Sequence, residues 1–396
     1  MMNNINATKY NPINNTTKVQ FERTSAIIGS NVDVPARRVP RDKPFLLSRM
    51  SLKREKHIKY FTRHLELFPS HYIPYDSSLT SLVYFCICGL GLLGALDYLP
   101  GDRAKWIDWV YSNLVDTGEG FRGSESHKVK GEYGPLHDPA NLSSTFFCLA
   151  ILAVLEDEDM PVRLDRQKIM AYVKQCQRPD GSFASVSHPI KGPMGESDLR
   201  HTYVATGIRY MLGLGPDSST QTPDIDAGKT IDYIRSLQTY DGGLGNMPDN
   251  ESHAGLTFCG VGSLYLLNRL DNKFSNPLIQ WLSKRQHPNE YGGFNGRCNK
   301  DADTCYSGWT QTCLDMLNCL DIIDPDMNED YLLNHTQHNL LGGFSKCEGN
   351  YPDPLHSFFG LASLALTRPG KHNLQPFNSP LCVPASAVDH LSRLKW

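Results

Sequence analysis

The chain has 396 residues, of which 20% are charged and 40% hydrophobic, an ordinary mixture for a globular protein with a large core. Its formal net charge of -3 lacks the basic excess expected of a nucleic-acid-binding surface. Polar residues and glycines interrupt the most apolar segment, Leu79–Leu96, so we expect a buried helix there and no insertion into a membrane.

The cysteines and the chain ends bear on the compartment. Eleven cysteines are scattered without framework spacing, and most of them stand inside apolar helical segments. This usage predicts reduced, buried thiols in a cytoplasmic protein. The N-terminal residues lack the apolar core of a signal peptide, and the final residues, SRLKW, do not form a lipidation signal.

Composition along the chain predicts three parts. Residues 1–45 are rich in Asn, Thr, Pro and basic residues without an apolar period, which predicts a flexible extension. Residues 46–368 are expected to form the main helical domain, beginning with a helix that Pro69 ends. Residues 369–396 contain four prolines and are expected to form a tail that wraps the surface.

A small-residue turn closed by an aromatic residue or leucine recurs through the central part. The closing residues are Phe121, Phe183, Leu244, Phe294 and Phe344, spaced by 62, 61, 50 and 50 residues. A helix precedes each turn, ending near a Gln in all but the first case. A more apolar helix follows each turn, predicted over residues 143–155, 202–214, 254–267, 306–320 and 356–366.

This repeat predicts an all-α fold of helix pairs, each of which buries its apolar face on its neighbours. The second helix of each pair is apolar on most sides, which favours a closed ring over an open solenoid. Periodicity alone does not decide closure. Residues 185–199 and 217–224 are predicted to be loops, and no strand of useful length is expected.

The segment Gly296–Trp309 carries the densest chemistry. Asp303 and Cys305 stand two residues apart, and a carboxylate and a thiolate so placed can share one tetrahedral zinc ion. The simpler alternative is a surface carboxylate beside a buried thiol. Arg297 and Lys300 add positive charge suited to an anionic leaving group such as diphosphate.

A histidine far along the chain strengthens the zinc interpretation. His356 opens the apolar helix HSFFGLASLAL, where a neutral imidazole could complete a set with Asp303 and Cys305. Three protein ligands leave one position open, which is typical of a catalytic zinc rather than a structural one. A thiol of the substrate could fill that position.

Three motifs in this order resemble the β subunits of the protein prenyltransferases: ESHAGLTFCG at 251–260, GRCNKDADTCYSGW at 296–309 and DPLHSFFG at 353–360. The resemblance covers roughly residues 52–366. REKHIKYF at 54–61 and FRGS at 121–124 are most similar to the β subunit of protein geranylgeranyltransferase type I. The resemblance implies an α/α barrel (toroid) and an obligate heterodimer with the α subunit shared with farnesyltransferase.

The resemblance also implies roles for particular residues. It makes Asp303, Cys305 and His356 the ligands of one Zn2+ per β subunit. The residues that would hold the diphosphate of the isoprenoid donor are His253, Arg297, Lys300 and Tyr306. The positions that would line the lipid and peptide cavity are Arg200, Tyr203, Gly255, Cys259 and Trp309.

Three further positions bear on the subtype. Ser81, one turn before Phe85, stands where the farnesyl enzyme has a bulky Trp, so a longer isoprenoid would fit. Leu355 replaces a Tyr and suits a substrate that ends in Leu. Lys346 stands where the farnesyl enzyme has a magnesium-binding Asp, so Mg2+ would not be required.

The implied reaction transfers geranylgeranyl from geranylgeranyl diphosphate to the cysteine of C-terminal CaaX sequences, preferably CaaL. The implied clients are small GTPases of the Rho and Rac type. Two positions depart from the family pattern and affect the preference for the last substrate residue: Asn141 replaces a His, and His201 replaces an aromatic residue.

Other functions remain open at this point. The β subunit of Rab geranylgeranyltransferase shares the zinc and diphosphate motifs, and the farnesyltransferase β subunit is a second relative. A terpene cyclase shares the helical barrel, but its acid motif needs clustered carboxylates, and DADT at 301–304 is one short. A non-catalytic scaffold with a structural zinc would need a fourth ligand, for which Cys298 and Cys347 are the candidates by residue type.

Overall fold

The computed structural model describes residues 51–396 except 130, 132–133, 215–221 and 289–291. The chain divides into two units, Met1–Leu46 and Leu47–Trp396, and only the second contains described residues. The extension predicted over residues 1–45 therefore lies outside the described part.

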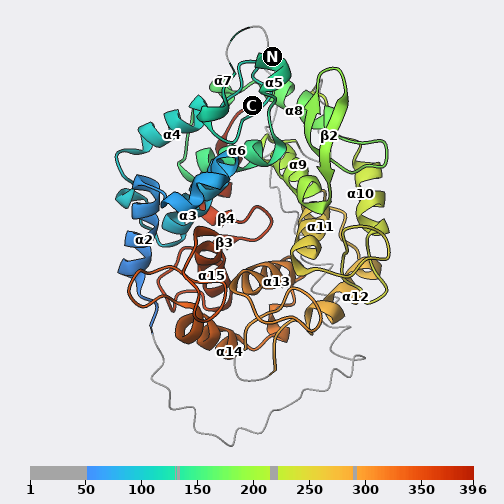
Figure 1. Cartoon of the computed structure of the whole chain (residues 1–396). Helices are drawn as coiled ribbons and strands as arrows, with labels where there is room; N and C mark the ends of the chain where they lie inside the picture. The colour runs from blue at the N-terminus through green and yellow to red at the C-terminus, as the bar shows by residue number, and fades with distance from the viewer. Residues whose placement is uncertain (1–50, 130, 132–133, 215–221, 289–291) are drawn as a thin grey trace, which may run out of the picture. The chain divides into compact units, whose positions relative to one another are not determined.

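A closed ring of six helices forms the interior of the second unit (Figure 1). Each helix packs against the next, and the last packs against the first, so the ring is closed. The predicted all-α toroid is confirmed, including the closure that periodicity did not decide. In order, the helices are α3 (Leu79–Leu92), α6 (Leu142–Val154), α9 (Leu199–Met211), α11 (Ala254–Leu266), α13 (Thr304–Met316) and α15 (Pro354–Thr367).

The first of these inner helices is the apolar segment that we expected to be buried. It follows the 3-10 segment Ser70–Ser78, and the whole stretch Ser70–Leu92 is long and apolar enough to cross a membrane by length and composition alone. However, 61% of its apolar window is buried inside the protein, and α3 contacts both α6 and α15. A helix buried on most sides is expected at the centre of a large fold.

A second set of helices lies outside this ring (Figure 1). In α12, for example, Phe274, Leu278 and Trp281 are buried at helical spacing, while Lys273 and Gln280 are exposed. The outer helices are α2 (Arg54–Glu66), α4 (Arg103–Ser112), α8 (Arg166–Gln175), α10 (Ala227–Ser236), α12 (Asn272–Leu282) and α14 (Pro325–Asp330), which continues into a π-helical turn, Tyr331–Thr336. Shorter helical pieces are Leu96–Tyr98, Glu125–His127, α5 (Gly134–His137), α7 (Met160–Arg163) and Leu320–Ile322.

The recurring Gln and the turn-closing residue form one structural device. Each pair makes an isolated backbone bridge, and the Gln side chain bonds the next outer helix at or near its start. Gln337 repeats this across the ring closure, because its Oε1 accepts from the Lys53 amide at 2.8 Å. Gly342 adopts φ +78°, and a Cβ there would lie 2.1 Å from the Lys56 carbonyl oxygen. The repeat therefore also fastens the last turn to the first helix.

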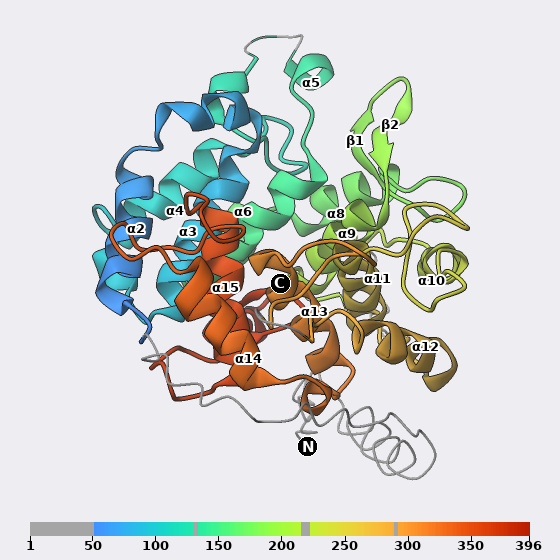
Figure 2. The same ribbon diagram turned by 60° about the horizontal axis from the view of Figure 1, so that its bottom comes forward.

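One of the two predicted loops contains strands. The predicted loop 185–199 contains an antiparallel hairpin of β1 (Ala184–His188) and β2 (Gly192–Ser197), which projects at the edge of the ring (Figure 2). Pro193 obscures this strand in the sequence, but a two-stranded ribbon has free edges that tolerate a proline. Part of the other predicted loop, 217–221, lies outside the described residues.

The proline-rich tail does not simply wrap the surface. It forms β3 (Phe377–Asn378), β4 (Val383–Pro384) and α16 (Ala385–Arg393), and Leu381 and Val383 are each 1% exposed. The Tyr84 hydroxyl on α3 donates to the Cys382 carbonyl, and the Tyr203 hydroxyl on α9 donates to the Pro380 carbonyl at 2.9 Å.

A third bond, from the Ser379 hydroxyl to Asp315, reaches α13. Because these three inner helices are not neighbours in the ring, the segment 379–382 spans the ring from one side to another, and β3 and β4 appear within its outline in Figure 1. The short apolar run Leu381–Val383 explains the error, since it needs cover that a surface position would not provide.

Candidate active site

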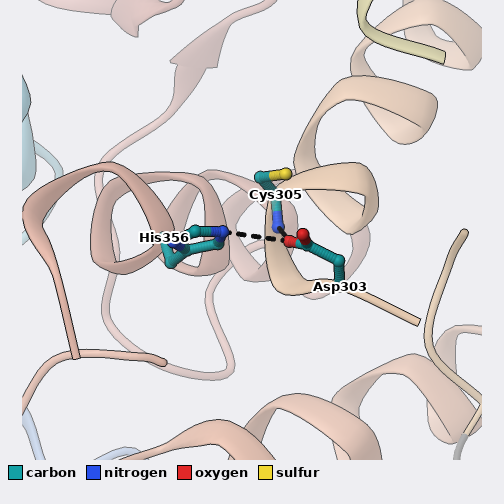
Figure 3. Close-up of side chains that lie close together, drawn as sticks. All are labelled: Asp303, Cys305 and His356. Carbon is teal, nitrogen blue, oxygen red and sulfur yellow. Dashed lines mark hydrogen bonds and ion pairs between the residues drawn. The ribbon is translucent and has the colours of Figure 1, made fainter. Parts of the chain in front are cut away.

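Asp303, Cys305 and His356 converge where α13 and α15 begin (Figure 3). One possible ligand atom from each lies within 4.8 Å of the others. Asp303 is the N-cap of α13, and its Oδ1 accepts from the Cys305 amide at 2.9 Å. His356 Nε2 lies 3.0 Å from the same oxygen. The three residues predicted as metal ligands are thus brought together by two neighbouring inner helices.

A fourth residue, Asp353, orients the histidine. It is the N-cap of α15, and its Oδ1 accepts from the His356 amide at 3.0 Å. Its Oδ2 lies 2.5 Å from His356 Nδ1, which leaves Nε2 facing Asp303 and Cys305. Metal-binding histidines commonly donate their second N–H to a carboxylate in this way. The sequence interpretation missed Asp353, although an Asp followed by a Pro at the start of an apolar helix is an N-cap signal.

The electrostatics fit a site for a cation. Burial alone lowers the pKa of His356, but hydrogen bonds with Asp303 and Asp353 outweigh it and raise the pKa to about 9. Burial opposes ionisation of Asp303, yet its hydrogen bond with His356 holds the pKa of Asp303 below its ordinary value. Burial, reinforced by Asp303, raises the pKa of the Cys305 thiol well above its ordinary value.

In the metal-free protein, a proton on His356 supplies the positive charge between the carboxylates of Asp303 and Asp353. One carboxylate, one thiol and one oriented imidazole form a donor set of the kind that zinc takes. Zinc binding there would displace protons from His356 and Cys305. No fourth protein donor joins the cluster among the described residues, and the free thiols Cys298 and Cys347 lie outside it.

A histidine–tyrosine pair borders the cluster. His253 is the N-cap of α11, and its Nδ1 accepts from the Gly255 amide at 3.1 Å. A neutral imidazole then carries its proton on Nε2, which lies 3.1 Å from the Tyr306 hydroxyl. This donation leaves the hydroxyl hydrogen of Tyr306 free for another acceptor. Burial, followed by the charge of Arg297, lowers the pKa of His253 and so favours the neutral form.

The predicted cations take three different positions. Arg297 pairs with Glu251 at 3.0 Å, a partner that the sequence did not indicate. The Lys346 ammonium lies 3.9 Å from Asp303 Oδ2 and its side chain is 59% exposed, so it faces the metal cluster. The exposed Lys300 lines a separate cavity together with Arg285, although it follows Arg297 by only three residues.

A series of contacting aromatic side chains leads from this cluster into the space between the inner helices. The Tyr306 and Trp309 rings lie 5.5 Å apart, and Gly255 makes room for Trp309, since a Cβ there would lie 3.2 Å from the indole. The series of aromatic contacts continues from Trp309 to Phe359, then to Phe85 and then to Phe147, with successive ring centroids 5.1, 6.1 and 6.2 Å apart. The sequence analysis did not single out Phe359 and Phe147.

The two positions predicted to set specificity are both half-buried. Ser81 stands one helical turn before Phe85 on α3, and its hydroxyl donates to the Ser78 carbonyl at 2.6 Å. Leu355 immediately precedes His356 at the start of α15.

The other cavity-lining candidates lie on α9 and α11. Arg200 pairs closely with Asp198, the N-cap of α9, and burial of its neighbour Cys259 raises the pKa of that thiol. Tyr203 is buried against Phe258 and bonded to the tail, away from the metal cluster.

The two family departures occupy structural positions. Asn141 is the N-cap of α6, where it accepts from the Ser144 amide at 3.2 Å. His201 is 8% exposed, and its Nδ1 lies 3.6 Å from Asp198 Oδ1.

Comparison with known proteins places this arrangement in a family. The prenyltransferase alpha-alpha toroid domain matches residues 52–383. The chain belongs to the prenyltransferase family. This membership agrees with the closed ring of inner helices and with the metal cluster at one end of it.

Among prenyltransferases, two curated relatives are geranylgeranyl transferase type-1 β subunits. The one from Dictyostelium discoideum is 34% identical over 79% of this chain and 90% of its own length. The one from Arabidopsis thaliana is 33% identical over 85% of this chain and 90% of its own length. A solved structure of Candida albicans protein geranylgeranyltransferase-I complexed with GGPP has a TM-score of 0.79 and 31% identity, covering 87% of this chain and all of that chain.

Proposed function

We propose that this chain is the catalytic β subunit of a zinc-dependent protein geranylgeranyltransferase type I. The observation that carries the proposal is one arrangement at the ends of three inner helices. An oriented Asp–Cys–His set lies beside a histidine–tyrosine donor pair, and an aromatic wall starts at the same tyrosine. The named relatives support the isoprenoid class.

Asp303, Cys305 and His356 would hold the zinc ion. When bound, zinc supplies a Lewis acid that keeps the cysteine of a C-terminal CaaX substrate as a thiolate at neutral pH. The chain's own residues prepare this site, because Asp353 fixes the His356 ring and the Asp303 carboxylate is held ionised. The substrate thiolate attacks C1 of geranylgeranyl diphosphate, a thioether bond forms, and the bond from C1 to the diphosphate oxygen breaks.

The leaving diphosphate gains negative charge as that bond breaks. Tyr306 can donate its free hydroxyl hydrogen to this charge, because His253 Nε2 donates to its oxygen. Burial raises the pKa of Tyr306 to about 12, so the hydroxyl keeps its proton at neutral pH. Arg297, Lys300 and Lys346 add fixed positive charge, and prearranged donors and charges of this kind lower the barrier to charge separation.

Isoprenoid length would depend on the interior wall. Each buried CH2 group of the chain contributes about 0.8 kcal/mol, but only if the interior has room for it. A serine at position 81 leaves space one turn from Phe85, where a bulky residue would shorten the interior. We therefore propose a preference for the twenty-carbon donor over the fifteen-carbon donor.

The partners follow from the same proposal. We infer an α subunit of the kind shared with farnesyltransferase, and CaaL proteins such as Rho- and Rac-type GTPases as clients. The Lys346 ammonium would replace Mg2+ near the diphosphate, so added Mg2+ would not be needed. The free cysteines favour a cytoplasmic location.

A competition between donors tests this function. The chain, co-expressed with a type I α subunit, is given equal farnesyl and geranylgeranyl diphosphate and a peptide ending in CaaL, without Mg2+. We expect a twenty-carbon adduct by mass, and a shift toward the fifteen-carbon adduct in Ser81→Trp. A fifteen-carbon adduct with the unmodified chain would contradict the role of Ser81. Transfer only to an escorted Rab protein would contradict the type I assignment.

A further inference from the structure

A polar cavity lies beside the loop that carries Arg297 and Lys300. It has a volume of about 410 Å3. Its lining is mostly basic or able to donate hydrogen bonds, with one carboxylate. The lining residues are Lys284, Arg285, His287, Asn295, Cys298, Asn299, Lys300 and Asp301. No residue of the Asp303–Cys305–His356 cluster lines it, and Lys300 is the one residue that it shares with the proposed diphosphate site.

Arg285 is the most unusual member of this lining. It is only 3% exposed, yet no carboxylate lies within 4.0 Å of its guanidinium among the described residues. The guanidinium lies 4.4 Å from the centre of the Trp281 ring, and its Nε donates to the Trp281 carbonyl at 3.3 Å. Its Nη1 has no hydrogen-bond partner in the described structure. A buried cation with an unused donor is costly unless an anion completes it.

The second feature of the cavity is a thiol. All eleven cysteines lie in the described part of the chain, and Cys298 is the only exposed one among them. Arg285 Nη2 donates to its sulfur at 3.3 Å, so the thiol and the buried cation touch. Asn295, 7% exposed, adds an unpartnered Oδ1 to the same lining. The cavity thus offers a nucleophilic sulfur, a buried positive charge and an unused acceptor together.

We propose that Cys298 and Arg285 form a thiol–disulfide exchange site for an anionic, peptide-sized disulfide such as glutathione disulfide. The carboxylates of the disulfide bind Arg285, Lys284 and Lys300. Cys298 loses its proton to solvent, and its sulfur attacks one sulfur of the disulfide. A new S–S bond to Cys298 forms, the original S–S bond breaks, and the second half leaves as a thiolate that takes up a proton. No other oxidant is needed.

The exchange would regulate transfer, and this consequence rests on the proposed function. Cys298 lies between Arg297 and Lys300, which we assign to diphosphate binding. Of these two cations, Lys300 also lines the cavity, so a glutathionyl group on Cys298 places carboxylates beside Lys300, where they compete with the diphosphate. A reductant that removes the group frees Lys300 again. The cavity would thus make prenyl transfer sensitive to the thiol–disulfide balance.

The test measures adduct formation directly. The full chain with its α subunit is freed of reductant and treated with glutathione disulfide or with neutral 2-hydroxyethyl disulfide. Mass spectrometry of peptides then gives the modification rate at each cysteine. We expect the anionic disulfide to modify Cys298 about tenfold faster than the half-buried Cys347, and added salt to reduce this difference. The neutral disulfide should show little preference between the two.

Variants separate the parts of the proposal. Cys298→Ser should form no adduct there and keep its transfer activity after glutathione disulfide treatment, whereas Cys347→Ser should behave as the unmodified chain. Arg285→Gln should slow the exchange most. If that variant does not fold, exposed Lys284→Gln should still slow it by about twofold to threefold.

Three results would overturn the proposal. They are an unmodified Cys298, equal rates at Cys298 with the anionic and neutral disulfides, and full transfer activity in the adduct. Failure of the proposed function is seen separately, because the untreated enzyme would then give no prenylated peptide whether or not the adduct forms.

Discussion

The two ends of helix α13 show how one ring of helices holds two kinds of polar group. At its start, Asp303, Cys305 and Tyr306 meet His356 and His253, and their pKa values are shifted by burial and by one another. Near its other end, the Asp315 carboxylate accepts one hydrogen bond from the Ser379 hydroxyl of the tail. The tail similarly meets Tyr84 and Tyr203 through its backbone carbonyls.

The two regions differ in whether their polar groups keep hydrogen-bond donors or ligand atoms that no other group of the protein uses. At the tail, each tyrosine hydroxyl finds a carbonyl, which satisfies a buried donor and stabilises the fold. At the helix starts, the N-cap residues Asp303, Asp353 and His253 point their side chains at His356 or Tyr306 in the first helical turns, and a metal ligand set and a free hydroxyl hydrogen remain. Chemistry is therefore expected at the helix starts, and stability at the tail.

The largest expected effect comes from removing a proposed metal ligand. His356→Ala deletes the imidazole and leaves Asp303 and Cys305 without their third partner. We expect zinc affinity and prenyl transfer each to fall by more than about a hundredfold. Zinc content by mass spectrometry and transfer to a CaaL peptide measure this. Cys347→Ala, which removes a free thiol outside the cluster, is the matched control and should keep both.

Asp353→Asn should have the next largest effect. An amide NH2 cannot accept the His356 Nδ1 proton, so the tautomer with a proton on Nε2 is favoured and the metal-binding nitrogen is blocked. We expect zinc binding to weaken by about tenfold to a hundredfold in a chelator competition. Asp324→Asn is the control, since Asp324 also caps a helix before a proline and orients no metal ligand. Equal zinc affinities in the two variants would refute the positioning role.

Zinc affinity should rise with pH. Below the His356 pKa of about 9, zinc must displace the imidazolium proton, and it must also displace the Cys305 thiol proton. Affinity should therefore rise with pH, by up to about a hundredfold per pH unit below pH 9 and by less above it. Chelator competition at several pH values measures the slope. A pH-independent affinity would contradict protonation of these two ligands in the metal-free protein.

The last comparison is between Tyr306 beside the metal cluster and Tyr84, which bonds the tail. Tyr306→Phe removes a donor to the leaving group, and we expect transfer to slow by about tenfold to a hundredfold with unchanged stability. Tyr84→Phe removes a buried donor to the tail, and we expect about 1–2 kcal/mol less stability with nearly unchanged transfer. Denaturant unfolding and peptide transfer assays separate the two. The opposite pattern would contradict the division between a catalytic cluster and a stabilising tail.

Local signals predicted much of this molecule. The turns closed by Phe183 or Phe344 and the apolar helices after them follow from spacing, because each repeat is one local unit. The proposed metal ligands Asp303 and Cys305 are two residues apart in the sequence, and His356 lies in the first turn of the adjacent inner helix. Ring closure was not predictable from the period, since it depends on contacts such as Gln337 with Lys53, 284 residues apart.

The errors share a physical cause. The hairpin of β1 and β2 and the buried run Leu381–Val383 are short, and neither has a period that a sequence pattern detects. Glu251 as the partner of Arg297 depends on the approach of two loops, which no local signal encodes. Asp353, in contrast, could have been predicted from the sequence. It precedes a proline at the start of an apolar helix, which is an N-cap signal, and it stands three residues before His356.

The most direct test of the account is the zinc coordination itself. Extended X-ray absorption at the zinc edge counts the sulfur ligands before and after a CaaL peptide is added to the full chain with its α subunit. We predict one sulfur, from Cys305, with nitrogen and oxygen neighbours in the free enzyme, and two sulfurs in the peptide complex. Zinc without a sulfur ligand, or an unchanged sulfur count with the peptide bound, would contradict a catalytic site that receives the substrate thiol.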